Sequence, residues 1–322
     1  MSVVENIQIV RDTYELALWR FAFPDCVRSY DDEYYHIVDS NNYGRLDADI
    51  EKLEKLLKKC PHYLDAYNSL ASSFLDCDEL DLAIQVWRKG FDLINAIFPT
   101  EFEYGKDKIE YYIIDNRAYF RVCYGMAYGL ITRAQVLNRK LLKTWDYEEA
   151  AKILETLVTV YPNDNIGARR SLPKCYLYLQ KYQEILNLLK KYPEGASHEL
   201  EYGSVLAAFK LNRINQASKL LTRAITNTPL VGEILLLKSP KELKAEDYND
   251  DYITCGSGYE AYKYWLDYNC FWDDKAKSFI NEGKDLIESV KSEKRSLWGS
   301  AIPEEYRSPY PKDFSLEGCG IC

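Results

Sequence analysis

The sequence predicts an all-α fold, a right-handed α-solenoid of helix hairpins with an irregular insertion and a C-terminal cap helix. Apolar residues recur at steps of three and four along successive segments, which is the spacing of an amphipathic helix. Small and large marker residues also recur with a period of ~34 residues. They are Ala150, Leu157 and Pro162 in one copy, and Ala217, Ala224 and Pro229 in another. The composition is that of a globular chain, with 47% hydrophobic and 28% charged residues.

Most of the chain forms one predicted repeat domain, residues 1–298, followed by a flexible tail at 299–322 that is marked by three prolines. Neighbouring hairpins in such a domain bury their apolar faces against each other. In order, the expected parts are N-terminal helices at 1–60, a repeat at 61–99, the insertion at 100–145, regular repeats at 146–229 and C-terminal helices at 230–298.

The N-terminal part is expected to be helical. Val3, Ile7, Val10 and Tyr14 begin a helical spacing that predicts an amphipathic helix over residues 3–22, which Pro24 ends. A short helix and a loop should follow over residues 30–49, and a further helix begins at Ile50.

The first repeat contains two helices over residues 67–74 and 80–91. A hairpin needs small residues where its helices cross, and Ala71 and Ala83 occupy those positions, with Trp87 among the large residues that surround them. Residues 100–145 depart from the period and are dense in aromatic residues. We expect a long or a broken helix there, carrying the insertion.

The regular stretch that follows should contain helices over residues 147–157, 168–179, 182–189, 200–211 and 214–224. Pro173 lies inside one of these patterns, so that helix should start late or kink. After a short apolar run, a helix begins at Tyr259, and residues 279–290 should form the polar-faced cap.

Part of this region resembles a known group of proteins. Residues 161–169 read Tyr-Pro-Asn-Asp-Asn-Ile-Gly-Ala-Arg and resemble the junction of tetratricopeptide-repeat (TPR) proteins that are widespread in bacteria. The distal positions are similar to those of the same group and of the suppression-of-tumorigenicity protein 7 family, although Thr228 interrupts the usual Asn-Pro pair. These positions are Asn227, Pro229, Gly256, Ser257, Glu260, Ala261, Tyr264 and Trp272. The resemblance implies a right-handed helical array without established catalysis.

Charge and cysteine content limit the classes of function. The net charge is −9 and the pI is near 5.1, which argues against broad nucleic-acid binding. No apolar run approaches the length of a membrane span, and we expect no signal peptide, because the start lacks a basic region and an apolar core. Nine scattered cysteines indicate free thiols in a reducing compartment, so we expect the cytoplasm.

The predicted site is a concave groove that binds a protein or a peptide. By repeat register, the first helix of each hairpin points one row of side chains into it. The row comprises Asn68, Ser72, Asp76, Arg169, Tyr176, Tyr202, Phe209 and Lys210. This mixture differs from the Lys/Asn clamp of chaperone-binding repeats, and its aromatic members favour an apolar peptide or helix. Arg169 either grips a carboxylate of the partner or forms an internal ion pair with Asp164, and each aromatic residue could equally pack between repeats.

We expect no catalytic residue, no cofactor and no metal. His36, His62 and His198 share no metal-ligand spacing, and nucleotide-binding and hydrolase signatures are absent from the sequence. The segments 163–165 and 257–260 are interpreted as helix caps, the second of them a Ser-x-x-Glu capping box.

Two alternatives remain. One is an enzyme or effector whose site lies in the aromatic insertion 100–145 and uses Glu103, Asp107, Glu110 or Tyr111. The other is a prenyl-anchored adaptor, because the chain ends in Cys319-Gly320-Ile321-Cys322, a loose match to a lipidation motif.

Overall fold

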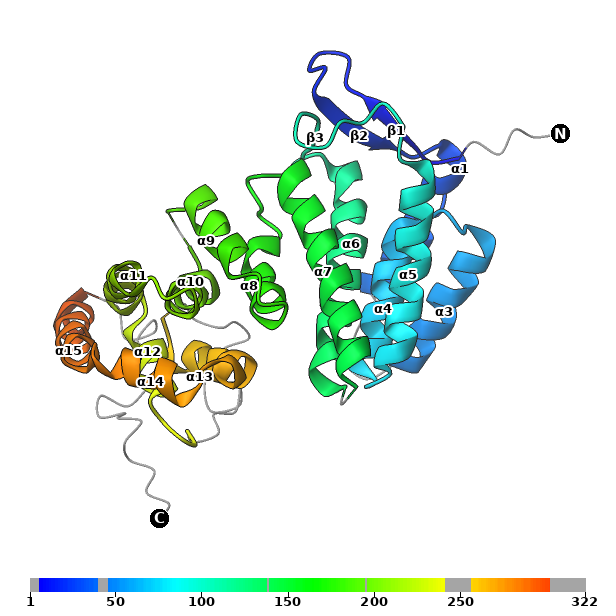
Figure 1. The fold of residues 1–322 in the computed structure, drawn as a ribbon. Helices are drawn as coiled ribbons and strands as arrows, with labels where there is room; N and C mark the ends of the chain where they lie inside the picture. Colours follow the sequence, from blue (N-terminus) through cyan, green and yellow to red (C-terminus); the bar gives the residue numbers. More distant parts are fainter. Residues whose placement is uncertain (1–5, 40–45, 138, 195, 241–255, 302–322) are drawn as a thin grey trace. The chain divides into compact units, whose positions relative to one another are not determined.

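The structure, a computed structural model, describes residues 6–39, 46–137, 139–194, 196–240 and 256–301. It divides into an N-terminal unit, Met1–Cys175, and a C-terminal unit, Tyr176–Cys322 (Figure 1). The predicted all-α class and its helix hairpins are confirmed, because consecutive antiparallel helices pack in pairs within each unit. In the described part of the chain, no helix is both long and apolar enough to cross a membrane.

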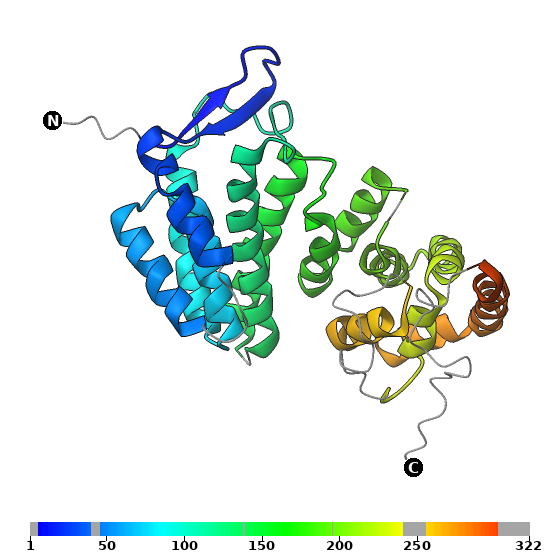
Figure 2. The ribbon, with the colours of Figure 1, turned by 180° about the vertical axis from the view of Figure 1, so that it is seen from behind.

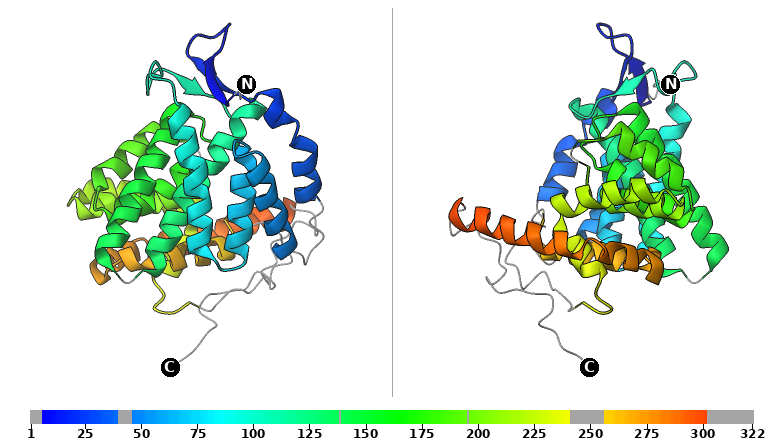
Figure 3. Two further views of the ribbon diagram at one scale, coloured as in Figure 1. Left: turned by 90° about the vertical axis from the view of Figure 1, so that its right-hand side faces the viewer. Right: turned by 60° about the vertical axis from the view of Figure 1, so that its left-hand side comes forward.

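The predicted helix over residues 3–22 is wrong. β1 (Gln8–Arg11) and β2 (Leu18–Ala22) form an antiparallel hairpin, and β3 (Lys108–Ile109) pairs with β2 in parallel. Ile7 and Ile9 are buried while Gln8 between them is exposed, which is the alternation of a strand. Tyr14, counted in the helical pattern, lies in the turn and is 98% exposed. The sheet lies at the end of the N-terminal unit where α5 ends and α6 begins (Figures 1 and 3).

The first helices pack beside the first repeat. They are α1 (Asp25–Arg28), α2 (Asp31–Asp39) and α3 (Leu46–Lys59). Figure 2 shows α2 lying alongside α3. The Tyr34 hydroxyl of α2 lies 2.8 Å from the Ser69 hydroxyl, and the Tyr63 hydroxyl donates to Asp31 at 2.8 Å, so α2 is fixed to the segment that starts the first repeat.

The first repeat consists of α4 (Leu64–Asp76) and α5 (Leu80–Ile97), and Ala71 and Ala83 are fully buried at its crossing as predicted. The Trp87 ring of α5 packs against α6 at Gly125 and Gly129. A Cβ atom added at Gly125 would lie 2.3 Å from Trp87 Nε1. These glycines therefore permit the close approach of the Trp87 ring to the backbone of α6.

Only the first part of the predicted insertion is irregular. It contains β3 and the short 3₁₀ helix η1 (Ile114–Asn116). It is followed by α6 (Arg117–Val136) and α7 (Lys140–Val160), which pack closely as a further hairpin. Asn116 fixes the irregular part to the sheet, since its Oδ1 accepts a hydrogen bond from Phe21 N at 2.9 Å.

The regular helices follow in the predicted order. They are α8 (Ala168–Tyr178), α9 (Tyr182–Lys191), α10 (His198–Lys210) and α11 (Ile214–Asn227). Pro173 lies in the second turn of α8, which begins at Ala168, so the predicted late start is wrong and the kink stays a prediction. Asp164 caps this helix, because its carboxylate accepts hydrogen bonds from Ala168 N and Arg169 N at 2.8 Å each.

The C-terminal unit ends in a group of helices that cover α10 and α11. They are α12 (Pro229–Leu235), α13 (Gly258–Tyr268), η3 (Asn269–Phe271), α14 (Asp274–Asn281) and α15 (Lys284–Ala301). The serine half of the predicted capping box is confirmed, since Ser257 Oγ accepts from Glu260 N at 3.1 Å. Glu260 Oε2 accepts from the N–H of Gly256, one residue before the cap, at 2.7 Å. The cap expected over residues 279–290 is divided between α14 and α15, and Gly283 between them lies against Ile225 of α11.

Candidate functional site

The predicted groove positions of the N-terminal unit lie on α4. Asn68 is half-buried, and its Oδ1 accepts a hydrogen bond from Trp87 Nε1 at 3.2 Å, which holds the Asn68 amide against α5. Ser72 is half-buried one turn further along, and Asp76 is exposed at the end of the helix. Ser72 and Asp76 therefore remain accessible to a partner.

The groove positions of the C-terminal unit contact the chain's own distal helices. Tyr202 is 0% exposed, and its hydroxyl donates to the Thr228 carbonyl oxygen at 2.8 Å. Burial raises the pKa of the Tyr202 hydroxyl, so it stays protonated. Phe209 packs against Phe279 of α14 with ring centroids 5.2 Å apart, and Lys210 Nζ bonds to Asp273 Oδ2 at 2.5 Å. A partner could reach Tyr202 only if the distal helices moved away, whereas Phe209 and Lys210 are half-exposed.

The remaining two groove positions lie on α8. Tyr176 is buried. Arg169 has 27% of its side chain exposed, and its Nε lies 3.8 Å from Asp164 Oδ2. The structure thus contains the internal ion pair that the sequence offered as one of two roles for Arg169, while the exposed part of its guanidinium stays accessible.

A buried polar cluster joins α10 to α13. His198 Nδ1 lies 3.3 Å from Glu260 Oε1, and His198 Nε2 lies 3.2 Å from Glu199 Oε1. The Tyr264 ring packs edge-on against the imidazole, with ring centroids 5.7 Å apart. Because Glu260 also belongs to the capping box, this cluster fixes the start of α13, and His198 takes a structural position.

Residues of the alternative enzyme site contact local partners in the irregular loop, the sheet and the start of α6. Asp107 Oδ2 accepts from Glu103 N at 2.9 Å and lies 3.8 Å from Arg11, while Glu103 pairs with Lys106. Glu110 is half-buried, and burial raises the pKa of its carboxyl. The Tyr111 ring lies under the Arg117 guanidinium at 5.3 Å. Glu103, Asp107 and Tyr111 thus each have a local contact.

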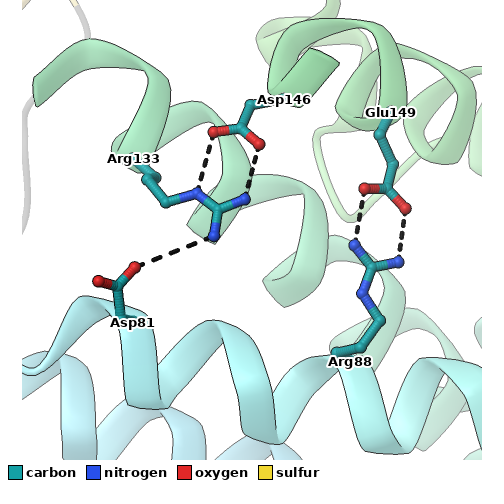
Figure 4. A network of polar contacts seen from close by, with 5 residues as sticks. All are labelled: Asp81, Arg88, Arg133, Asp146 and Glu149. Carbon is teal, nitrogen blue, oxygen red and sulfur yellow. Dashed lines mark hydrogen bonds and ion pairs between the residues drawn. The ribbon is translucent and has the colours of Figure 1, made fainter. Parts of the chain in front are cut away.

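Two bidentate ion pairs join α5, α6 and α7 in the N-terminal unit (Figure 4). Arg88 bonds to the two oxygens of Glu149 at 2.5 and 2.6 Å, and Arg133 bonds to those of Asp146 at 3.0 and 2.7 Å. Arg133 also lies 3.9 Å from Asp81 of α5. These hydrogen bonds raise the pKa of both guanidinium groups. Arg133 links the start of α5 and the end of α6 to the first turns of α7, while Arg88 joins the middle of α5 to the middle of α7.

Exposed apolar side chains lie near the start of α5, the end of α6 and the start of α7. Val136 is 70% exposed, Leu141 62% and Trp145 55%, while Leu82 and Leu142 are exposed to a smaller extent. Leu82, Val136 and Trp145 lie within three residues of Asp81, Arg133 and Asp146 in sequence, near the helix ends that Arg133 joins. We call the five apolar residues and the exposed cations Arg139 and Lys140 the tip surface. The sequence carried a signal for it in the run Arg-Lys-Leu-Leu-Lys-Thr-Trp at 139–145, which we assigned to the insertion.

Metal and lipid sites gain no support from the geometry. Within the ranges that the structure describes, no three His, Cys, Asp or Glu side chains gather as metal ligands would. Cys319 lies outside the described residues.

Comparison with known proteins finds similar helical arrays among solved structures. No protein-family model and no curated protein matches the sequence. A solved variant of nearly identical TPR-like repeats, from a Podospora anserina protein assigned as a kinesin light chain, is similar at 14% identity and a TM-score of 0.42. The match covers 63% of this chain and 95% of that one. A TPR protein of Thermus thermophilus is similar at 15% identity and a TM-score of 0.36, over 62% of this chain and 89% of its own. The resemblance to the suppression-of-tumorigenicity protein 7 family stays a prediction.

Proposed function

We propose that the protein is a non-catalytic scaffold that binds a partner protein through the tip surface. The observation that carries the proposal is the exposure of Val136, Leu141 and Trp145 near the helix ends that the bidentate Arg133–Asp146 ion pair joins. Clustered large apolar side chains on a surface are typical of interaction sites, and a rigid surface loses little conformational entropy on binding.

The rim of the tip surface defines the chemistry of the partner. Arg139 and Lys140 are exposed next to Leu141 in a chain whose net charge is −9. A partner helix or loop that presents an apolar ridge flanked by carboxylates would pair with both parts. Trp145 is the expected energetic centre, since a large aromatic ring that becomes buried contributes strongly to binding.

A quantitative pull-down tests this proposal. The full chain, a Leu141→Ser/Trp145→Ser variant and an Ile214→Ser/Leu266→Ser variant would be compared on lysate from the source cells. Ile214 and Leu266 are exposed apolar residues of the C-terminal unit and serve as the matched control. We expect specific partners to be lost with the first variant and retained with the second. Equal recovery by the first variant, with a wild-type circular dichroism spectrum, would refute the assignment.

The concave groove remains a second candidate surface on the same scaffold. Ser72, Asp76 and the exposed part of the Arg169 side chain support it, because they are predicted positions of the N-terminal unit that stay accessible. A Ser72→Arg/Asp76→Arg variant in the same pull-down separates the two surfaces. If the Ser72→Arg/Asp76→Arg variant loses partners and the Leu141→Ser/Trp145→Ser variant retains them, binding is assigned to the groove.

The proposed compartment is the cytoplasm. Cys60, Cys77 and Cys123 are free thiols, which fits a reducing environment. The lipid-anchored alternative is decided by the intact mass of the chain after expression in a eukaryotic cell, because a prenylated Cys319 adds a mass that an unmodified chain lacks.

A further inference from the structure

A cavity of about 130 Å³ lies in the N-terminal unit among α5, α6 and α7. Four of its ten lining residues are aromatic: Phe91 and Phe98 from the α5 segment, Tyr119 from α6, and the exposed Tyr104 of the irregular loop. The cavity is close in size to an engineered cavity of about 150 Å³ that holds benzene. It therefore has room for a single six-membered ring.

Two buried polar groups of α6 line this cavity. Tyr119 is 2% exposed and Cys123 is 3% exposed. Neither the Tyr119 hydroxyl nor the Cys123 thiol has a hydrogen-bond partner among the described residues. Burial raises the pKa of both groups, so both stay protonated and can donate. A ligand that supplies an acceptor would pair with these donors.

The remaining polar lining is basic or neutral. Lys152 of α7 is exposed and forms no ion pair within the described parts of the chain, while Asn95 and Thr156 add an amide and a hydroxyl. Among the residues that the structure describes, no carboxylate lines the cavity. In a chain with a net charge of −9, an unpaired ammonium beside an aromatic cavity favours an anion that carries an apolar ring.

We propose that this cavity binds a single-ring aromatic carboxylate, with the ring between the aromatic walls and the carboxylate on Lys152. A polar substituent opposite the carboxylate would face the Tyr119 hydroxyl and the Cys123 thiol. This site is separate from the tip surface and adds a small-molecule ligand to a protein-binding scaffold.

Calorimetric titration of the full chain with benzoate and with 4-hydroxybenzoate tests the proposal. We expect saturable binding of both, with 4-hydroxybenzoate the tighter, and no binding of acetate, which lacks a ring. Lys152→Gln should weaken benzoate binding about five-fold, the scale of an exposed ion pair. Lys89→Gln, an exposed lysine of α5 that does not line the cavity, should leave it unchanged.

Further variants locate the ligand. Cys123→Leu should abolish binding by filling the cavity, and Tyr119→Phe should remove the advantage of 4-hydroxybenzoate over benzoate. A substitution at the buried Cys123 can also disturb the fold, so Tyr104→Ala gives an independent test at an exposed residue. It should also weaken binding of both aromatic acids. The proposal is overturned if the folded wild type binds neither aromatic acid, if acetate binds equally well, or if Tyr104→Ala and Lys152→Gln leave binding unchanged.

Discussion

The contact between Trp87 and Gly125 gives the sharpest prediction about the N-terminal unit. In Gly125→Ala, the new methyl group would lie 2.3 Å from Nε1 and 2.5 Å from Cε2 of the Trp87 ring, so the ring must move. Trp87 is 3% exposed, so its ring can move only if the side chains around it repack. The shift also breaks the hydrogen bond from Trp87 Nε1 to Asn68 Oδ1.

The change in stability is the sum of two destabilising effects and one stabilising effect. Overpacking a core costs about 1–3 kcal/mol, and loss of a hydrogen bond costs about 1 kcal/mol. Alanine in place of glycine inside a helix recovers about 1 kcal/mol. Gly125→Ala should therefore destabilise the N-terminal unit by about 1–3 kcal/mol in spite of its better helix propensity.

Native-state hydrogen exchange of the α6 amides measures this effect within the N-terminal unit, apart from the C-terminal unit. The same substitution in a Trp87→Leu background is the matched control, because the smaller side chain leaves room for the methyl group. There, Gly125→Ala should be neutral or stabilising by up to about 1 kcal/mol. The reasoning is refuted if Gly125→Ala stabilises the wild type, or if it costs the same in both backgrounds.

Three further predictions concern charged groups. Asp146→Asn should destabilise the N-terminal unit by about 1–3 kcal/mol, because it leaves Arg133 with a weakened partner in a partly buried site. Urea unfolding measures the change in stability. The control Glu51→Gln, in an exposed ion pair with Lys55, should leave the stability unchanged. The pKa of Asp273 lies below its ordinary value of 3.8, because Lys210 and the Ala276 N–H both donate to its carboxylate. Ionised Asp273 therefore stabilises the fold above about pH 4, and this contribution is lost as the pH falls through the lowered pKa. Asp273→Asn keeps a cap residue but should make the loss of stability below about pH 4 shallower, and a steeper loss in acid unfolding would contradict the sign. Arg139→Glu/Lys140→Glu should slow association with the captured partner and reduce its salt dependence in surface plasmon resonance, and an unchanged rate would remove these cations from the interface.

Local patterns accounted for the helices but not for contacts between distant segments. Ala71 and Ala83 identified a hairpin because they are small residues on two successive helices that only one short turn separates, so the helices can cross closely at them. The N-terminal strands were missed because the apolar spacing over residues 3–22 also fits a helix. What decides for a sheet there is the pairing with β3 and Asn116, about 90 residues away in the chain.

The predicted groove shows the same limitation. Repeat register placed Tyr202 in a row on α10, but register alone cannot show that α13 covers that row. The covering helix follows α10 only after α11 and α12, and the centroids of the Tyr202 and Tyr264 rings lie 5.8 Å apart. The tip surface escaped prediction for a related reason, since its ion pairs join residues of three helices.

Hydrogen–deuterium exchange of the full chain with and without its captured partner tests the central claim most directly. The account predicts that the partner slows exchange in peptides covering residues 133–146, while those covering α11 stay unchanged. Slower exchange confined to α4 around Ser72 and Asp76, or to the C-terminal unit, would contradict the assignment of binding to the tip surface.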